Sequence, residues 1–409
     1  MRAIVLDGNE NQAVASTRSL GRAGVSVVVG DSTAWSKAGW SRFASRSFQY
    51  VAPQVDASRF VEDVARVAAE VPGTVVMPMT ERTTIPLSER RELLDRAGAR
   101  YVLPEHATLL RAMNKQETTA LANSLGVATP ATEVLRDEAA AARFARVAHY
   151  PVVLKPATSE ERVGTGAMRS TGKPLYARSP DEFIAAFHQL ASRSATILAQ
   201  EYVEGRGAGY FALMNRGRLC AEFAHRRIRD VRPTGSGSAV RESVAVDPRL
   251  RAAALPILEA LAWHGVAMVE FRLREDGSPV FLEVNGRFWN SLALPVIAGV
   301  DFPAMLFRLA SATDVGPVPA YRAGVRCRWW LGDVRHLVAV LRGRPPEFQG
   351  YFPGRLETIG KFFMPVPGTH HDNFTWDDPL PELADWLDFG TRRIPRALHA
   401  SRSRHNDAP

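Results

Sequence analysis

The stretch VAMVEFRLREDGSPVFLEVNGRFWN, residues 266–290, decides the fold of this chain. Its alternating apolar and polar residues predict two β-strands joined by a tight turn. The pair Asp276-Gly277 predicts a type I′ turn, which needs positive φ at both central residues. With this pair as the loop, Glu270 faces Glu283 and Phe271 faces Leu282. The strand pattern further predicts one apolar face that packs on a core, formed by Val269, Phe271, Leu282 and Val284.

The other face of the predicted hairpin places Glu270 opposite Glu283 and continues along Asn285 and Arg287. Paired strand residues lie about 4.5–5.5 Å apart at Cβ, and like charges there destabilise a sheet. A divalent cation would offset the repulsion, because Mg2+ is commonly held by one or two carboxylates together with substrate phosphates. The alternative is a hairpin with a solvated face, on which the two glutamates splay apart.

Length and composition predict a globular protein of two or three domains. The chain has 409 residues, of which 46% are hydrophobic. No apolar run is long enough to span a membrane, and the first residues lack the features of a signal peptide. Cys220 and Cys327 form neither a disulfide framework nor a metal pattern. We therefore expect a cytoplasmic protein with no membrane partner.

The net charge of +8 raises the question of nucleic-acid binding. The basic residues are almost all arginine, spread along the chain, and lysine occurs only at positions 37, 115, 155, 173 and 361. No nucleic-acid-binding motif accompanies the charge. Charge alone supports only non-specific contact, so nucleic acid is not expected as a partner.

Residues 1–112 alternate between strand and helix patterns, which predicts an α/β unit with a parallel sheet. We expect strands at 3–6, 25–29 and 74–77 and helices at 11–23, 59–70 and 87–97, with a polar segment at Thr80-Glu81. The first turn reads DGNENQ and lacks the G-x-G-x-x-G fingerprint. The unit is Rossmann-like in architecture, without evidence for a dinucleotide.

Lysines mark the next segment. Lys115 begins a predicted helix that ends at Gly126, and Lys155 lies in the apolar strand YPVVLKP. A buried lysine without a partner is costly, so Lys155 should face a negative group; the alternative is an edge-strand lysine in solvent. Residues 157–172 predict a flexible loop whose N–H groups could reach phosphates, or else a plain surface loop.

A basic cluster follows the strand predicted at 219–223. It comprises His225, Arg226, Arg227 and Arg229, with the loop at 233–238 and Arg241 after it. We interpret this region as a candidate carboxylate clamp, because guanidinium groups pair bidentately with carboxylates. The alternative is a solvated basic face or additional phosphate contacts.

Lys115, Lys155, the hinge AQEYVEG at 199–205 and the strand FLEVNGRFW at 281–289, in this order and spacing, resemble the ATP-grasp superfamily. The resemblance covers about residues 1–310 and is greatest to carbamoyl-phosphate-synthase-like, predicted carboxylate–amine ligase members. The combination is more specific than any single motif. Two of the five lysines stand where the family needs them.

The resemblance implies an α/β and α+β fold, with a Rossmann-like pre-ATP-grasp domain, a two-lobed ATP-grasp domain and a C-terminal extension. The implied boundaries are a pre-ATP-grasp domain at 1–112, an N-terminal lobe with a lid loop at 113–203, a C-terminal lobe with the metal site at 204–312, the extension at 313–399 and a disordered tail at 400–409. The tryptophans of the extension could shape the acceptor pocket or cover a lobe, and we expect the second because aromatic side chains bury large areas; these are Trp329, Trp330, Trp376 and Trp386.

The same resemblance implies a site. Lys115 and Lys155 would contact ATP phosphates, and Arg287, with Lys155, would act in catalysis by neutralising charge on the transferred phosphoryl group. Glu270 and Glu283 would hold Mg2+, with Mn2+ as an alternative ion, and Asn285 would complete the metal site. The adenine would be bound at the hinge by Gln200, Glu201, Tyr202 and Val203.

The implied activity is ATP-dependent ligation, in which a carboxylate becomes an acyl phosphate that an amine attacks, giving an amide, ADP and phosphate. The partners would be small-molecule carboxylates and amines, and a homodimer is left open. Two alternatives stand beside it. One is an ATP-grasp enzyme for bicarbonate-dependent carboxylation or plain phosphoryl transfer; the other is a catalytically silent nucleotide-binding protein.

Overall fold

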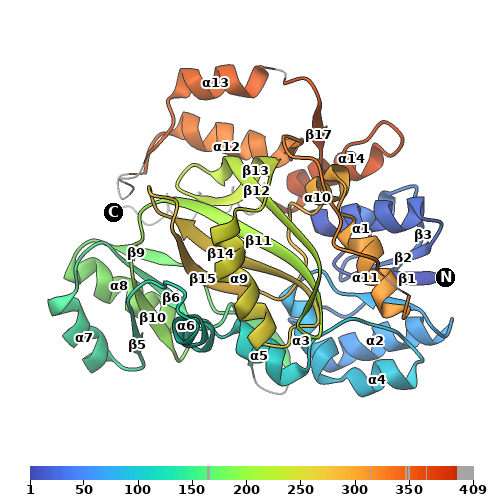
Figure 1. Cartoon of the computed structure of the whole chain (residues 1–409), viewed down its shortest axis with the longest axis horizontal. Coiled ribbons are helices and arrows are strands. Elements are labelled where there is room, and N and C mark those ends of the chain that lie inside the picture. The colour runs from blue at the N-terminus through green and yellow to red at the C-terminus, as the bar shows by residue number, and fades with distance from the viewer. Residues whose placement is uncertain (164–165, 314, 346–347, 349–350, 365, 394–409) are drawn as a thin grey trace, which may run out of the picture.

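The computed structural model describes residues 1–163, 166–313, 315–345, 348, 351–364 and 366–393. The tail predicted to be disordered, 400–409, lies outside these residues. The described chain is a mixed α/β protein with three larger sheets and a small two-stranded sheet. Figure 1 shows the N-terminal sheet in blue, a green lobe on the opposite side, and long strands between them. Within the described residues, no helix combines the length and apolar character needed to cross a membrane.

The N-terminal sheet is parallel throughout, with the strand order β3-β2-β1-β4. Its strands are β1 (Arg2–Val5), β2 (Ser26–Asp31), β3 (Ala44–Gln49) and β4 (Val75–Met77). Successive strand residues point to opposite faces, so Val5 and Val29 pack with helix α1 (Asn11–Arg22) while Ile4 and Val28 pack with α2 (Ala57–Ala69). The predicted strand–helix alternation is confirmed here.

The helix predicted at 87–97 is wrong in its bounds. The structure instead has α3 (Glu81–Glu89) and α4 (Arg91–Arg96), so the segment at Thr80-Glu81 begins a helix. Glu81 lies in the first turn of α3, where the helix dipole favours a carboxylate. Helices α5 (His106–Met113) and α6 (Lys115–Ser124) follow. The Asn114 side chain caps α6 by accepting from the backbone N–H of Gln116 at 3.0 Å.

The green lobe of Figure 1 is built on an antiparallel sheet with the order β5-β10-β6-β9. Its strands are β5 (Thr132–Leu135), β6 (Val152–Pro156), β9 (Leu175–Ala177) and β10 (Ile197–Glu201). One face packs on α7 (Glu138–Val147) and α8 (Pro180–Ala191), with Leu154 and Phe183 in a shared core. Lys155 and Gln200 lie on strand positions that point to the opposite face.

The loop predicted at 157–172 contains a hairpin, so that prediction is wrong over most of its length. The strands are β7 (Glu160–Val163) and β8 (Ala167–Ser170), and the intervening Gly164 and Thr165 lie outside the described residues. The backbone N–H of Met168 donates to Pro53 O at 2.9 Å, and the Met168 side chain is buried. This contact with the N-terminal unit is long-range, so the local sequence did not reveal it.

The central sheet has seven strands in the order β15-β14-β11-β12-β13-β16-β17, and all neighbours are antiparallel except β16 and β17. The strands are β11 (Arg206–Asn215), β12 (Arg218–Arg232), β13 (Ser236–Val244), β14 (Gly265–Leu273), β15 (Pro279–Asn285), β16 (Arg326–Arg328) and β17 (Thr369–His371). The loop predicted at 233–238 is shorter than expected, because β13 begins at Ser236. Helix α9 (Pro248–Ala260) packs on one face of this sheet.

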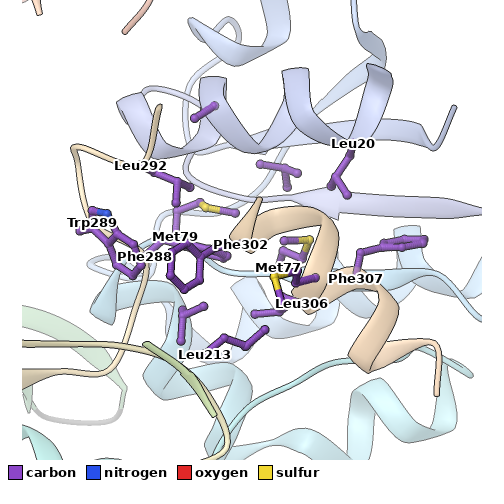
Figure 2. Packing of buried hydrophobic residues seen from close by; sticks show 14 of the residues in the cluster. Leu20, Met77, Met79, Leu213, Phe288, Trp289, Leu292, Phe302, Leu306 and Phe307 are labelled. Carbon is purple, nitrogen blue, oxygen red and sulfur yellow. The ribbon is translucent and has the colours of Figure 1, made fainter. Parts of the chain in front are cut away.

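The other face of the central sheet shares a core with the N-terminal unit. Helices α10 (Ala293–Ala298) and α11 (Phe302–Ala310) lie in this core. Figure 2 shows Leu20 of α1, Met77 of β4, Leu213 of β11 and Leu306 of α11 converging there. Because the apolar contacts are continuous, the N-terminal sheet and the central sheet are packed as one body.

The C-terminal part adds α12 (Trp330–Arg342), α13 (Arg355–Phe363), α14 (Leu380–Asp388) and a π-helical turn (Phe389–Arg393). Helix α12 packs over β12 and β13, and the chain then returns so that α14 lies beside the blue N-terminal unit in Figure 1. Trp376 is 92% exposed and Trp386 is 37% exposed. The expectation that these tryptophans cover a lobe is therefore wrong for Trp376 and Trp386.

Candidate active site

The hairpin of β14 and β15 pairs Glu270 with Glu283, which confirms that part of the predicted register. The turn differs from the type I′ prediction. Gly277 N–H donates to Arg274 O at 2.9 Å, and Gly277 alone of the Asp-Gly pair has a positive φ, +79°. The loop is therefore three residues long, 275–277, with glycine in the left-handed position that such loops require.

A bulge after Glu270 restores the register that the longer loop shifts. Phe271 pairs with Phe281, and its predicted pairing with Leu282 is wrong. Phe281 enters the core, where its ring lies 5.9 Å from that of Phe271, and Leu282 is only half-buried. The extra loop residue and the bulge each shift the register by one residue, in opposite directions. Glu270 therefore still faces Glu283, while Phe281 takes the core position predicted for Leu282.

A row of paired residues crosses four strands at the glutamates. Gly209 of β11 pairs with both His225 of β12 and Glu270 of β14, which pairs in turn with Glu283. Directly paired residues share a face, so these side chains lie on the face that the N-terminal unit covers in part. A Cβ at Gly209 would lie 2.9 Å from the Phe211 ring, so only glycine fits beside Glu270 without displacement.

Both lysines of the predicted site reach the β15 strand. Lys115 Nζ lies 3.4 Å from Glu283 Oε2 and donates to Ser159 Oγ at 3.0 Å. Lys155 Nζ donates to the bulged carbonyl of Leu282 at 3.4 Å. Lys115 comes from the start of α6 and Lys155 from β6 of the green lobe, so two separate elements converge on β15.

The electrostatics of the glutamate pair are asymmetric. Burial opposes ionisation of Glu283, but the ammonium groups of Lys115 and Lys155 outweigh it and lower the pKa to about 2. Burial and the neighbouring Glu283 raise the pKa of Glu270, whose nearest cation is Arg227 at 4.0 Å. Burial also lowers the pKa of Lys155 to about 8. Glu270 is therefore a carboxylate whose charge the surrounding side chains compensate poorly.

Asn285 and Arg287 continue from Glu283 as a hydrogen-bonded chain. Asn285 Nδ2 donates to Glu283 Oε1 at 3.3 Å, and Arg287 Nη2 donates to Asn285 Oδ1 at 3.1 Å. Arg287 also donates to Phe288 O at 3.0 Å, which fixes the guanidinium. In the described part of the chain, no three His, Cys, Asp or Glu side chains gather as a metal site.

The predicted adenine segment lies where the two lobes join. β10 ends at Glu201, and the next strand, β11, begins at Arg206. Gln200 is buried and its Nε2 donates to Thr132 Oγ1 at 2.8 Å. Glu201 N–H donates to Ala131 O at 2.9 Å, and the Tyr202 ring lies 6.1 Å from that of Tyr176. Val203 is buried at 8% exposure. The structure thus brings Gln200 and Lys155 to one face of the green lobe.

A cleft of about 540 Å³ opens between the N-terminal unit and the end of β15. Its lining includes Glu283, Asn285 and Arg287 on one wall. The rest of the lining combines neutral polar side chains with acidic residues that were not predicted as site residues; the acidic ones are Asp7, Glu10, Asp31, Glu81 and Glu160. Their place in the sequence could have revealed three of them. Asp7, Glu10 and Asp31 lie at or just after the carboxyl ends of parallel strands, where α/β sheets bind ligands.

The basic cluster does not form the predicted clamp. Arg229 is already bidentate to Asp333, at 2.7 Å for both bonds, and the fully buried Arg241 pairs with Asp372. Burial, with Arg241 and Arg227 beside it, lowers the pKa of His225, so this side chain is neutral. The clamp prediction is wrong for these three residues, because carboxylates of the C-terminal part occupy the arginines.

Comparison with known proteins identifies relatives. The family model described as "ATP-grasp in the biosynthetic pathway with Ter operon" matches residues 193–332. The D-alanine–D-alanine ligase of Nitrosospira multiformis is 26% identical over 221 residues, covering 50% of this chain and 68% of that ligase. The vancomycin/teicoplanin A-type resistance protein VanA of Enterococcus faecium is 29% identical over 222 residues, 48% of this chain. This alignment spans only 60% of VanA.

Solved structures show the same fold. Biotin carboxylase from Campylobacter jejuni superimposes with a TM-score of 0.61 at 16% identity, covering 79% of this chain and 74% of that one. The L-amino acid ligase from Bacillus licheniformis gives 0.57 at 17% identity, covering 76% and 73%. The family model and the sequence relatives support the ATP-grasp superfamily for this chain, and the solved structures show that its fold is similar to theirs.

Proposed function

We propose that this protein is an ATP-dependent ligase that joins a small carboxylic acid to an amine. One observation carries the proposal: lysines from two separate elements converge on β15 beside a pair of directly opposed glutamates. A sequence relative named as a ligase supports it. The structural similarity to a biotin carboxylase keeps carboxylation as the competing outcome, although at 16% identity it concerns the fold alone.

The proposed reaction has two steps. A carboxylate oxygen of the acid attacks the γ-phosphorus of ATP, the bond to the bridging oxygen breaks, and ADP leaves. The amine nitrogen then attacks the carbonyl carbon of the acyl phosphate, the carbon–oxygen bond breaks, phosphate leaves and the nitrogen loses a proton. Little covalent chemistry falls to the protein in the first step, so positioning and charge neutralisation are its main tasks.

In this proposal the residues divide the task. Lys115 and Lys155 hold the ATP phosphates, and Arg287 neutralises charge on the transferring group. The adenine is bound by the hinge residues Gln200, Glu201, Tyr202 and Val203. This placement is supported by Gln200, which lies on the same face of the green lobe as Lys155. The hairpin of β7 and β8 stands beside Lys115 through Ser159 and would exclude water from the acyl phosphate.

Mg2+ fits the glutamate pair. Glu270 and Glu283 are directly opposed, and the ionisation of Glu270 is unfavourable with only protein groups around it. Two carboxylates plus substrate oxygens are a common way to bind Mg2+, which agrees with the lack of a third acidic ligand among the described residues. We assign the ion to Glu270 and Glu283, beside Asn285. When bound, Mg2+ would supply positive charge against the phosphates.

The cleft beside Arg287 is the proposed place of the acid and the amine. Glu10 and Glu81 face it without a side-chain hydrogen bond or ion pair to any described residue. Among the described residues that line it, guanidinium groups belong to Arg287 and to Arg82, and Glu160 neutralises Arg82 at 2.8 Å. An acidic lining suits a positively charged amine better than a phosphorylated acceptor.

The finer organisation is also proposed. We assign residues 1–112 to a pre-ATP-grasp domain, 113–203 and 204–312 to the two ATP-grasp lobes, and 313–399 to a C-terminal extension. We place the protein in the cytoplasm, where ATP is available and where thiols are kept reduced. A homodimer stays a prediction, which light scattering of the purified chain would test.

The test is ADP release from the full chain with Mg2+ and ATP, with and without an amino-acid mixture, and with bicarbonate in a parallel sample. Release that depends on the amino acids, with an amide product detected by mass spectrometry, supports ligation. Release that depends on bicarbonate supports carboxylation instead. Glu283→Ala should abolish turnover while the thermal transition persists, and retained activity would refute the metal assignment.

A further inference from the structure

The last described part of the chain is tied to the N-terminal unit by buried charges. We call residues 369–388, from β17 through α14, the C-terminal strap. Three of its aspartates are almost fully buried, and each pairs with a buried cation: Asp372 with Arg241, Asp378 with Arg18 and Asp385 with Lys37. Two of these cations, Arg18 and Lys37, belong to the N-terminal unit.

Asp385 differs from the other two aspartates because its partners Lys37 and Asn373 contact Asn11, which is next to the cleft residue Glu10. Its carboxylate accepts from Lys37 Nζ at 3.0 Å, from Asn373 Nδ2 at 3.0 Å and from Trp329 Nε1 at 2.7 Å. Lys37 and Asn373 also donate to Asn11 Oδ1, at 2.6 and 3.0 Å. Two donors on one oxygen fix the orientation of the Asn11 amide.

That orientation turns Asn11 Nδ2 toward Asn290, in the segment that follows the cleft residue Arg287. It donates to Asn290 Oδ1 at 3.3 Å. Asn11 directly follows Glu10 in the chain, and Asn290 comes three residues after Arg287; Glu10 and Arg287 both line the cleft. The backbone N–H of Lys37 also donates to Asn9 Oδ1 at 3.2 Å, and Asn9 is a further lining residue.

We propose that Asp385 is a positioning residue for the acceptor cleft, acting through Lys37, Asn373 and Asn11. It holds the loop between β1 and α1, which carries Glu10, at a fixed distance from the strand end that carries Arg287. The inference rests on the proposed function, in that the cleft must hold a substrate for this distance to matter. A misplacement of about 1 Å at a reacting centre can cost about 100-fold in rate.

A purely structural role would make the three aspartates equivalent. Asp378 supplies the matched comparison, because its pair with Arg18 is as buried as the pair of Asp385 with Lys37. Asp378 accepts from Arg18, Ser41 and the backbone of Arg42, and none of these donates to Asn11 Oδ1. Arg18 also donates to the backbone carbonyl of Asn373 at 2.7 Å, which is separate from the Asn373 side chain that contacts Asn11 and Asp385. Loss of either pair should therefore lower stability, while only the loss of Asp385 should disturb the cleft.

The experiment uses the full chain with Asp385→Asn, Asp378→Asn and Asn290→Ala. Hydrogen exchange reports the loop directly, as deuterium uptake of a peptide that covers residues 7–12. Asp385→Asn should raise this uptake and lower kcat/KM for the amino-acid mixture by about 10- to 100-fold, with KM for ATP unchanged. Asp378→Asn should lower the melting temperature and leave both readouts as in the unaltered protein.

Asn290→Ala tests the last link without disturbing a buried charge, because Asn290 is exposed. It should reproduce the loss in kcat/KM in weaker form, which keeps the inference testable if Asp385→Asn folds poorly. Equal effects of Asp385→Asn and Asp378→Asn on the peptide and on kcat/KM would overturn the positioning role. If the unaltered protein shows no amino-acid-dependent ADP release, the proposed function fails, whereas hydrogen exchange still decides whether Asp385 holds the loop.

Discussion

Two regions of this molecule bury charge in opposite ways. In the C-terminal strap, every buried aspartate meets an opposite charge at hydrogen-bond distance, as Asp378 meets Arg18 at 2.8 Å. On the site face, Glu270 is paired across the strands with another glutamate, and its nearest cation is 4.0 Å away. Satisfied charges hold the fold together, whereas a poorly compensated pair of like charges indicates a missing ligand.

The largest effect should come from Glu270→Gln. We expect turnover to fall by about 100- to 1,000-fold, because a charged group at the transferring phosphates is lost. The melting temperature should not fall, since the raised pKa of Glu270 means that the folded state disfavours its charged form. Coupled ADP assays and thermal melts measure the two quantities. A clear fall in melting temperature would mean that the charge of Glu270 stabilises the fold, as the buried aspartates of the strap do.

Asp372→Asn should have the opposite profile. It leaves Arg241 buried without a counter-charge, and we expect the free energy of unfolding to drop by about 3–5 kcal/mol. Denaturant unfolding measures this change. Residual turnover per folded molecule should stay close to that of the unaltered protein, because Arg241 is shielded from the cleft. A stability change below about 1 kcal/mol would place this pair with ordinary surface ion pairs.

The pH dependence of kcat/KM for ATP tests the charge of Lys155 on the site face. With its pKa lowered to about 8, Lys155 of the free enzyme is charged below that pH and loses its proton above it. We expect kcat/KM for ATP to fall by about 10-fold at one pH unit above this pKa, because a neutral amine no longer attracts phosphate. A pH profile from 6 to 10 tests this, and Lys155→Arg should move the fall to higher pH.

The smallest effect should come from Asp377→Asn, next to a buried aspartate of the strap. Asp377 pairs with Arg22 at 2.9 Å, and both side chains are 46% exposed. An exposed ion pair contributes little, so we expect less than about 1 kcal/mol in unfolding free energy and no change in turnover. Denaturant unfolding at low and high salt checks this. A loss as large as that of Asp372→Asn would show that burial does not explain the strength of the strap pairs.

Residue patterns, together with the family resemblance, predicted which residues the structure brings together at the candidate site. The Asp-Gly turn predicted that Glu270 faces Glu283, and this pairing is found because a bulge compensates for the longer loop. Lys115 and Lys155, on which the family resemblance rested, both reach the same strand in the structure. Hydrophobic periodicity is local, so a sequence carries it directly. The roles of these residues in binding ATP and Mg2+ stay predictions.

Tertiary structure decided the rest. A three-residue loop and a compensating bulge put Phe281 in the core in place of Leu282, and the carboxylates of Asp333 and Asp372 removed Arg229 and Arg241 from the predicted clamp. The acidic cleft and the pair of Asp385 with Lys37 join residues more than 250 positions apart. No local pattern encodes such partners, because the energy of a buried charge depends on which distant group the fold places beside it.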